Sequence, residues 1–211
     1  MLNKIKRYLI STYVKLNNST CTFSEGARVS RKACFGKNIK FGENCRIGAD
    51  VIIGDGVSIG VNTTLRHIRI GINSHIESGI KIVGTGKGKI KIGKECYIGA
   101  NNILDNSDDI IIGDFVHIAG PSTGLWCHST AQMCMNSIPL NDSARDKYRP
   151  TSPIRIESNV YVGGNCTIYP GITIGHHSVI APNSAVTKDV PSSSMVGGVP
   201  AKVINGIKKT S

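Results

Sequence analysis

The chain has 211 residues, which is enough for one domain with a small extension. Aromatic residues make up only 5% of it, and the formal net charge is +11 at pH 7. This charge predicts anionic partners, such as the phosphates of a nucleotide, an acidic polysaccharide or a membrane surface. No nucleic-acid-binding motif is found, so we expect no nucleic-acid partner. We also expect no transmembrane span and no signal peptide, because no apolar run is long enough.

The first residues have the pattern of a basic amphipathic helix. Its apolar positions are Leu2, Ile5, Leu9, Tyr13 and Leu16, which share one helical stripe. Two interpretations remain open for this segment: a helix that packs on the protein or a neighbouring subunit, and weak contact with an anionic membrane. Either arrangement can cover unpaired strand edges at one end of the main domain.

A large apolar residue recurs at every sixth position over most of the chain. The series includes Phe41, Ile47, Ile53, Ile59 and Leu65, and later Ile156, Val162, Ile168, Ile174, Ile180 and Val186. The next residue is often Gly, and the fourth residue after the apolar one is small or β-branched. A period of six fits neither a helix nor an alternating strand. It predicts a parallel β-helix, in which three hexapeptides close one coil and residues eighteen apart stack.

The residue before each small one is expected to form a corner of the coil. These positions hold Asn44, Asp50, Gly56, Asn62, Asn73, Gly79, Asn101, Asn159, Asn165, Gly171, Asn183 and Asp189. Asn, Asp and Gly tolerate positive φ better than other residues, so they allow the chain to turn every six residues. Cys45, Cys96 and Cys166 fall in the small inward slot, where we expect them to pack as small hydrophobic residues.

The repeat is interrupted in several places. The largest interruption lies between Ile118 and Ile156 and contains the residues Trp126, Cys127 and His128. A solenoid gains nothing from such an insertion, and long ordered loops are usually functional, so we expect the active site in a loop over about 124–153. The Gly-rich segment 85–89 lacks the spacing of a phosphate-binding P-loop and is interpreted as a turn.

The repeat and the end of the chain together resemble a known family. The tail runs Val-Thr-Lys-Asp-Val-Pro from Val186 and Gly-Gly-Val-Pro-Ala-Lys-Val-Ile from Gly197. It resembles the left-handed β-helix hexapeptide-repeat acyltransferases, in the branch of the galactoside, maltose and capsular-polysaccharide O-acetyltransferases. The resemblance implies an all-β, left-handed parallel β-helix over residues 21–190, preceded by the helix in 1–20 and followed by a tail over 191–211. The left hand rests on the resemblance, because parallel crossovers are normally right-handed.

The resemblance implies that His128 is the catalytic base. Acyl transfer from a thioester to an alcohol requires removal of the hydroxyl proton, which neutral imidazole accepts near neutral pH because its unperturbed pKa is about 6.5. Asp105 and Asp108 are both candidates for orienting the imidazole, and no spacing rule separates them. A Cys127–His128 nucleophile is rejected, because neighbouring side chains of an extended segment point to opposite sides.

The family positions also suggest residues around the two substrates. Trp126, Tyr161 and Asn101 fall in the region of the acyl group and acceptor, although Asn101 is better explained as a corner residue. Acetyl-CoA is the implied acyl donor. Its binding residues would be Gly164, Ala181, Thr187, Lys188 and Lys202, of which Thr187 and Lys188 match a phosphate-contacting pair. Tyr161 stands where relatives carry Trp, which leaves a stacking role there open.

The implied function is acetyl-CoA-dependent O-acetylation of a sugar hydroxyl, on a surface polysaccharide or its precursor. We expect a homotrimer with a saccharide acceptor and no metal, located in the cytoplasm, with peripheral contact at the inner membrane face as an open possibility. A zinc hydro-lyase of the γ-type carbonic anhydrase class shares the β-helix but needs three clustered His ligands. N-acetylation of a nucleotide-linked amino sugar is the other alternative.

Overall fold

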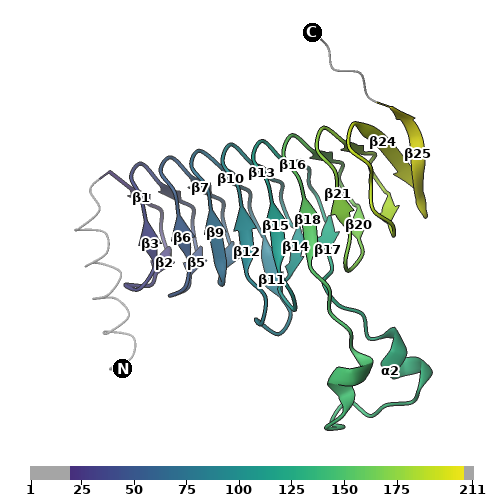
Figure 1. Ribbon diagram of the computed structural model, residues 1–211. Helices are drawn as coiled ribbons and strands as arrows, with labels where there is room; N and C mark the ends of the chain where they lie inside the picture. Colours follow the sequence, from purple (N-terminus) through teal and green to yellow (C-terminus); the bar gives the residue numbers. More distant parts are fainter. Residues whose placement is uncertain (1–19, 207–211) are drawn as a thin grey trace.

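The computed structural model describes residues 20–206, and these residues fold as a left-handed parallel β-helix (Figure 1). The fold class expected from the repeat is therefore confirmed. The amphipathic helix expected at the N-terminus falls on residues 1–19, outside the described part. No helix within residues 20–206 has the length and hydrophobicity needed to cross a bilayer.

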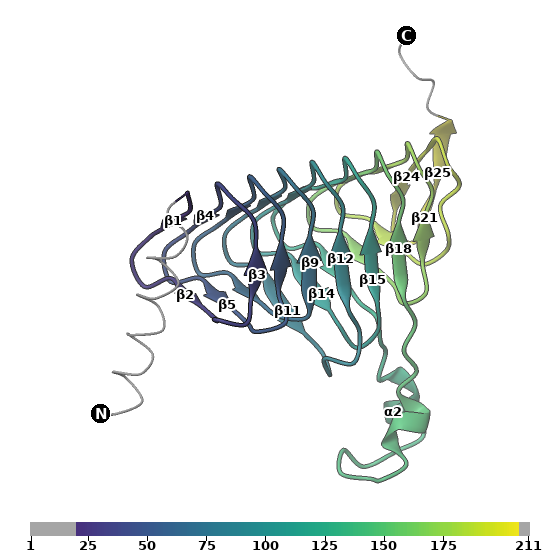
Figure 2. The ribbon, with the colours of Figure 1, turned by 60° about the vertical axis from the view of Figure 1, so that its left-hand side comes forward.

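Three sheets form the walls of the coil, and all of their strands are parallel except the last one, β25. The ten-stranded sheet consists of β1 (Thr22–Phe23), β4 (Lys40–Phe41), β7 (Ser58–Ile59), β10 (His75–Ile76), β13 (Tyr97–Ile98), β16 (His117–Ile118), β19 (Tyr161–Val162), β22 (Val179–Ile180), β24 (Ser194–Gly198) and β25 (Ala201–Gly206). The eight-stranded sheet consists of β2 (Arg28–Val29), β5 (Arg46–Ile47), β8 (Thr64–Leu65), β11 (Lys81–Val83), β14 (Ile103–Asp105), β17 (Gly124–Leu125), β20 (Thr167–Ile168) and β23 (Ala185–Val186). The seven-stranded sheet consists of β3 (Cys34–Phe35), β6 (Ile52–Ile53), β9 (Ile68–Ile70), β12 (Ile90–Ile92), β15 (Ile110–Ile112), β18 (Ile154–Ile156) and β21 (Thr173–Ile174). The chain visits the three sheets in turn, and Figure 2 shows the resulting stack of triangular coils.

Residues eighteen apart stack as the period predicted. Ile47 pairs with Leu65 in the eight-stranded sheet, and Ile156 pairs with Ile174 in the seven-stranded sheet. Each strand places one side chain inward and the next outward. The inward apolar residues form one continuous core, and burying each contributes about 1.5–3 kcal/mol. The small slot is also inward, because Cys45, Cys96 and Cys166 are all buried in this core.

Most of the predicted corner residues have positive φ. Asn62 (φ 57°) and Asn159 (φ 61°) are typical, and Gly56 (φ 70°) and Gly171 (φ 81°) occupy the same position in other coils. Asp50 and Asp189 are exceptions, because neither has positive φ. Each instead accepts a backbone N–H from an adjacent coil: Asp50 from His67 of the next coil (3.1 Å) and Asp189 from Thr173 of the preceding coil (2.8 Å). At these two corners, where φ is not positive, a hydrogen bond from the carboxylate to an adjacent coil stabilises the turn.

One long loop leaves the coil between β17 and β18. It carries the short helix α2 (Ala131–Met135) and a 3₁₀ turn, η1 (Arg145–Tyr148), and it projects away from the body of the solenoid (Figure 1). The solenoid also continues beyond Val190. Strand β24 pairs in parallel with β22, and β25 folds back antiparallel on β24, so the tail closes one end of the ten-stranded sheet.

Candidate active site

Three successive coils break their repeat at the same corner. The breaks are residues 84–89 after β11, 106–109 after β14, and 126–153 after β17. Because β11, β14 and β17 are neighbours in the eight-stranded sheet, the three insertions lie side by side where that sheet turns into the seven-stranded one. The long loop containing His128 is therefore flanked by irregular structure that the hexapeptide repeat does not require.

A buried carboxylate holds the imidazole of His128 at this corner. Asp105 is 0% exposed, and its Oδ2 accepts the hydrogen bond of His128 Nδ1. The two backbone N–H groups of Ser107 and Cys127 donate to the same carboxylate, each at 3.0 Å. A carboxylate beside Nδ1 places the ring proton on that nitrogen, so Nε2 carries the free lone pair. The His128 side chain is 20% exposed, which leaves it within reach of a substrate.

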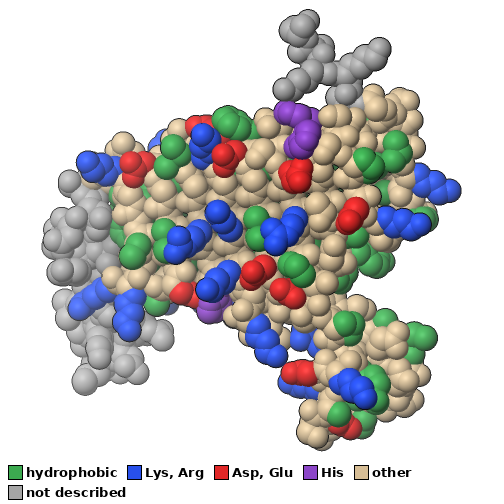
Figure 3. Space-filling model, in the orientation of Figure 1, with side chains coloured by type: hydrophobic (Ala, Val, Ile, Leu, Met, Phe, Trp, Pro, Cys, Tyr) green, Lys and Arg blue, Asp and Glu red, His purple; other side chains and the backbone are tan. Residues whose placement is uncertain are grey.

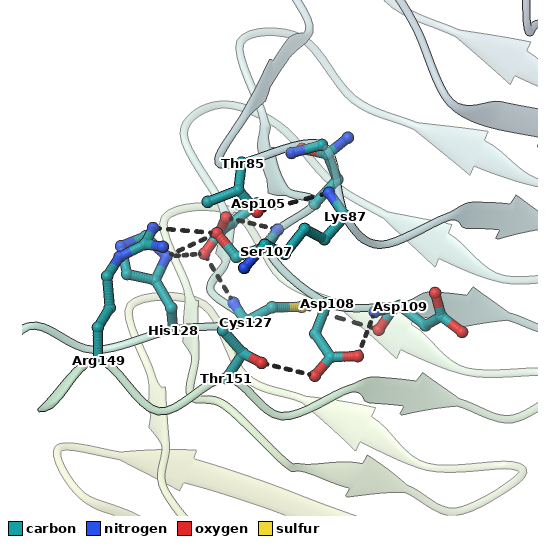
Figure 4. Close-up of polar contacts among 12 residues, drawn as sticks. Thr85, Lys87, Asp105, Ser107, Asp108, Asp109, Cys127, His128, Arg149 and Thr151 are labelled. Atoms are coloured by element: carbon teal, nitrogen blue, oxygen red, sulfur yellow. Dashed lines mark hydrogen bonds and ion pairs between the residues drawn. The ribbon is translucent and has the colours of Figure 1, made fainter. Parts of the chain in front are cut away.

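Two further side chains surround the imidazole, as Figure 4 shows. Ser107 Oγ lies 3.2 Å from His128 Nδ1, and Arg149 donates through Nη2 to the same hydroxyl at 3.2 Å. Ser107 comes from the 106–109 break, whereas Arg149 lies where the long loop returns to the coil. The hydrogen bonds of Ser107 therefore connect the end of the loop at Arg149 with the pair of Asp105 and His128, where the loop begins.

Asp108 fastens the base of the loop without touching the imidazole. Its Oδ2 accepts the hydroxyl of Thr151 at 2.9 Å, and Thr151 forms an antiparallel bridge with His128. Asp108 Oδ1 accepts the backbone N–H of Asp109 at 2.8 Å. The sequence left Asp105 and Asp108 as equal candidates for orienting His128, and the geometry selects Asp105.

The Gly-rich segment is a turn, as interpreted from the sequence, and it forms one wall of this corner. A Cβ atom at Gly84 would collide with Asp105 Oδ1, so only glycine allows the turn to approach the carboxylate. Gly86 donates its N–H to Asn106 Oδ1 at 3.2 Å, and Lys87 Nζ lies 3.4 Å from Asp146 in the long loop. Sequence reasoning did not associate this turn with the site, and it also missed Ser107, Arg149 and Thr151.

Cys127 is not placed to act as a nucleophile. Its side chain is fully buried, and Sγ lies 3.7 Å from the carbonyl oxygen of Asp109. Burial, aided by the nearby Asp105 charge, raises the pKa of the Cys127 thiol to about 12. Trp126 is half-buried and packs across Gly124, where a Cβ would overlap the indole nitrogen.

Two of the residues suggested for the acyl region, Tyr161 and Asn101, do not approach His128 within this chain. Tyr161 lies on the outer face of the ten-stranded sheet, where it is 42% exposed and pairs in register with His117. Asn101 is an exposed corner residue with φ 58°. His128 instead follows the eight-stranded sheet, so the walls of the coil lie between it and Tyr161.

Three residues suggested for the acyl donor meet at the far end of the solenoid. Thr187, Lys188 and Lys202 line one hollow of about 320 Å³, where β25 folds over the last coil. Gly164 and Ala181 lie elsewhere, in the segments that follow β19 and β22. A Cβ at Gly164 would lie 2.6 Å from the carbonyl oxygen of Gly120, so glycine is required there by close backbone approach.

The remaining histidines are scattered over the solenoid. His67 contacts Asp50, His75 contacts Glu77, His117 lies beside Tyr97, and His176 packs edge-on against His177. Within residues 20–206, no group of three His, Cys, Asp or Glu side chains is arranged to hold a metal ion.

Comparison with known proteins gives matches to the same repeat. The family model "Bacterial transferase hexapeptide (six repeats)" matches residues 153–188, and "Hexapeptide repeat of succinyl-transferase" matches residues 39–65 and 50–83. The galactoside O-acetyltransferase of Escherichia coli (strain K12) is 35% identical over 119 residues, which are 56% of this chain and 54% of that protein. A chloramphenicol acetyltransferase of Klebsiella aerogenes is 34% identical over 110 residues, covering 47% of this chain and 52% of that protein. The chain thus spans about half the length of these two relatives.

Among solved structures, the polySia specific acetyltransferase NeuO is similar over most of the chain. It shares 29% identity with a TM-score of 0.57, and the match covers 91% of this chain and 86% of that one. The fold is a hexapeptide solenoid with a His-bearing loop at one corner. Together with the repeat matches and these relatives, it makes the chain similar to the hexapeptide-repeat acetyltransferases.

The environment of Cys127 predicts an inert thiol. With a pKa of about 12, roughly one thiol in ten thousand is ionised at pH 8. We expect iodoacetamide at this pH to modify the exposed residues Cys34 and Cys134 and to spare Cys127, as read by peptide mass spectrometry. In urea, Cys127 should become labelled as well. Labelling of native Cys127 as fast as Cys134 would contradict the buried placement.

Proposed function

We propose that the protein is an acetyl-CoA-dependent O-acetyltransferase that acts on a sugar hydroxyl of a surface polysaccharide or its precursor. The observation that carries the proposal is the pair of Asp105 and His128. It offers a half-buried imidazole with Nδ1 held by a carboxylate and Nε2 free. This arrangement suits a general base, and it lies at the root of the loop that the sequence suggested for catalysis.

The proposed chemistry needs no covalent enzyme intermediate. His128 Nε2 accepts the proton of the sugar hydroxyl while the oxygen attacks the thioester carbonyl. The carbon–sulfur bond then breaks, the acetyl group remains on the sugar oxygen, and the imidazolium returns the proton to the leaving thiolate. Asp105 keeps the ring in one tautomer and stabilises the imidazolium while it carries the extra proton.

The donor is proposed to lie along the solenoid with its phosphates at the far end. The hollow that contains Thr187, Lys188 and Lys202 supports this, because it combines two lysines with a hydroxyl. Small residues near β19 and β22, such as Gly164 and Ala181, would let a thin pantetheine arm pass close to the backbone. The sequence similarity to a galactoside O-acetyltransferase supports acetyl as the acyl group and a sugar as the acceptor.

The acceptor is proposed to be acidic, because the chain has a net charge of +11. The polySia specific acetyltransferase supports a polymeric acceptor, since it matches over most of the chain. A reducing cytoplasm suits this enzyme, because all seven cysteines are free. Contact with the inner membrane face remains part of the proposal through the basic N-terminal segment.

We expect the enzyme to be a homotrimer, because a single chain separates its proposed substrate contacts. Tyr161 and His128 belong to different walls of one coil, so a site that uses both needs the Tyr161 face of a neighbouring subunit. Light scattering at micromolar concentration should give three times the monomer mass. A monomer that turns over acetyl-CoA at full rate would contradict this assembly.

Replacing His128 by Ala should remove most turnover and leave the fold intact. A general base contributes about 10²- to 10⁴-fold, so kcat should fall by that factor when free thiol is measured with acetyl-CoA and a polysaccharide acceptor. His176→Ala is the matched control, because His176 is exposed and contacts only His177 among the aromatic rings. If His128→Ala keeps more than about a tenth of the activity, another residue is the base.

Replacing Lys188 or Lys202 by Ala should weaken donor binding. Both residues are exposed, so we expect KM for acetyl-CoA to rise by several-fold to about tenfold, with kcat nearly unchanged because the phosphates are remote from the carbonyl. Lys81→Ala removes the same charge from β11, outside this hollow, and serves as the control. Comparison with dephospho-CoA identifies the lysine that contacts the 3′-phosphate. An unchanged KM in both variants would refute the assignment.

A further inference from the structure

One face of the solenoid carries a row of basic side chains that the site described above does not use. The outward residues of the seven-stranded sheet stack in register, in the order Ile52, Arg69, Lys91, Ile111 and Arg155. Neighbouring strands are about 4.8 Å apart, so Arg69 and Lys91 stand next to each other on the surface. Figure 3 shows Lys and Arg side chains gathered in the middle of this face, which Figure 1 turns toward the viewer.

The basic row lies in a hollow of about 630 Å³. Its lining includes four cationic side chains, Lys32, Arg69, Lys89 and Lys91, but only two carboxylates, Asp50 and Asp109. All four cationic side chains are exposed. The hollow also includes Ile52 and Ile111, which supply apolar surface at either end of the Arg69–Lys91 pair.

The carboxylates in the hollow are already engaged within the chain. Asp50 is bonded to the His67 ring and accepts its backbone N–H, and Asp109 Oδ1 accepts the backbone N–H of Lys89 at 2.8 Å. In residues 20–206, no carboxylate lies within ion-pair distance of Arg69 or Lys91. Neighbouring like charges repel, so this exposed pair would be stabilised by an anion from outside the protein.

The hollow opens beside the catalytic corner. Asp109 lines it and directly follows Asp108, which bonds to Thr151 at the base of the His128 loop. Lys89 and Asp109 precede β12 and β15, so the strands of this face begin where the 84–89 and 106–109 breaks end. In Figure 1 the long loop descends from the same edge of the sheet.

We propose that the row formed by Arg69 and Lys91 binds an acidic polysaccharide chain and leads it to His128. The inference rests on the proposed transferase function and adds to it the binding surface for the polymer. A polymer with repeated carboxylates matches the row of cations, and the apolar faces of its sugar rings match Ile52 and Ile111. A recessed, strand-lined hollow admits a linear chain, whereas a bilayer presents a broad surface that does not enter it.

The test is a binding titration of the full-length protein in the absence of acetyl-CoA. Fluorescently labelled polygalacturonate oligosaccharides are the probe, labelled dextran is the neutral comparison, and phosphatidylglycerol vesicles represent a membrane. Arg69→Gln with Lys91→Gln removes the row, and Lys40→Gln with Lys81→Gln removes two exposed charges on the other two sheets. Thermal unfolding of both double variants confirms that they are folded.

We expect polygalacturonate to bind in low salt, to weaken as salt rises, and to bind on the order of tenfold more weakly to the Arg69 and Lys91 variant. The control variant should stay within about twofold of the unaltered protein, and dextran should not bind. His128→Ala should bind polygalacturonate normally, which separates this inference from the catalytic proposal.

Three results would overturn the inference. They are an equal loss in both double variants, no binding of polygalacturonate in low salt, and vesicle binding that depends on Arg69 and Lys91 while polygalacturonate binding does not. The transferase proposal would survive each of them, because turnover of acetyl-CoA is measured separately.

Discussion

The narrow interior of the coil is the constraint on which the rest of this structure depends. Mostly one aliphatic and one small side chain per hexapeptide point inward, so the core of the ten-stranded sheet holds Ile76, Ile98 and Ile118 in one row and Ser74, Cys96 and Val116 in another. A polar side chain fits there only with a partner for every buried group. The regular coils therefore supply rigidity and a uniform set of outward positions, and reactive groups must lie where the repeat fails.

Asp105 shows how an interruption of the repeat is stabilised. An unpartnered carboxylate at 0% exposure would be costly, since each unsatisfied buried polar group costs about 1–3 kcal/mol and a charged one more. Here Ser107 and Cys127 donate backbone N–H groups from two successive coils, and His128 donates the third hydrogen bond. The same interactions that make the burial tolerable also fix the imidazole, so the stability of the corner and the orientation of His128 depend on one carboxylate.

The sequence predicted the fold well because the repeat is local and its physics is simple. The stacking of Ile47 on Leu65 and the positive φ of Asn62 both follow from the six-residue repeat. The loop and His128 were identified because the six-residue repeat is interrupted there. Asp105 was only one of two candidates, although it stands in the position after Leu104 where most repeats have Gly, which was a usable signal. Arg149 could not be predicted, because its contact with Ser107 depends on how a non-repetitive loop folds back across 42 residues.

The three walls of the coil present different surfaces, and this division bears on how the solenoid would bind the two substrates proposed for it. The corner with His128 adjoins the seven-stranded sheet, with its unpaired cations Arg69 and Lys91. Tyr161 lies on the ten-stranded sheet, and the hollow with Lys188 lies at the end where β25 closes that sheet. Within one subunit these features cannot converge, because the packed core separates the walls. In the proposed trimer, side-by-side association would bring the corner of one coil against the wall of another, so that the proposed donor enters from the far end while the proposed polymer crosses the outer face.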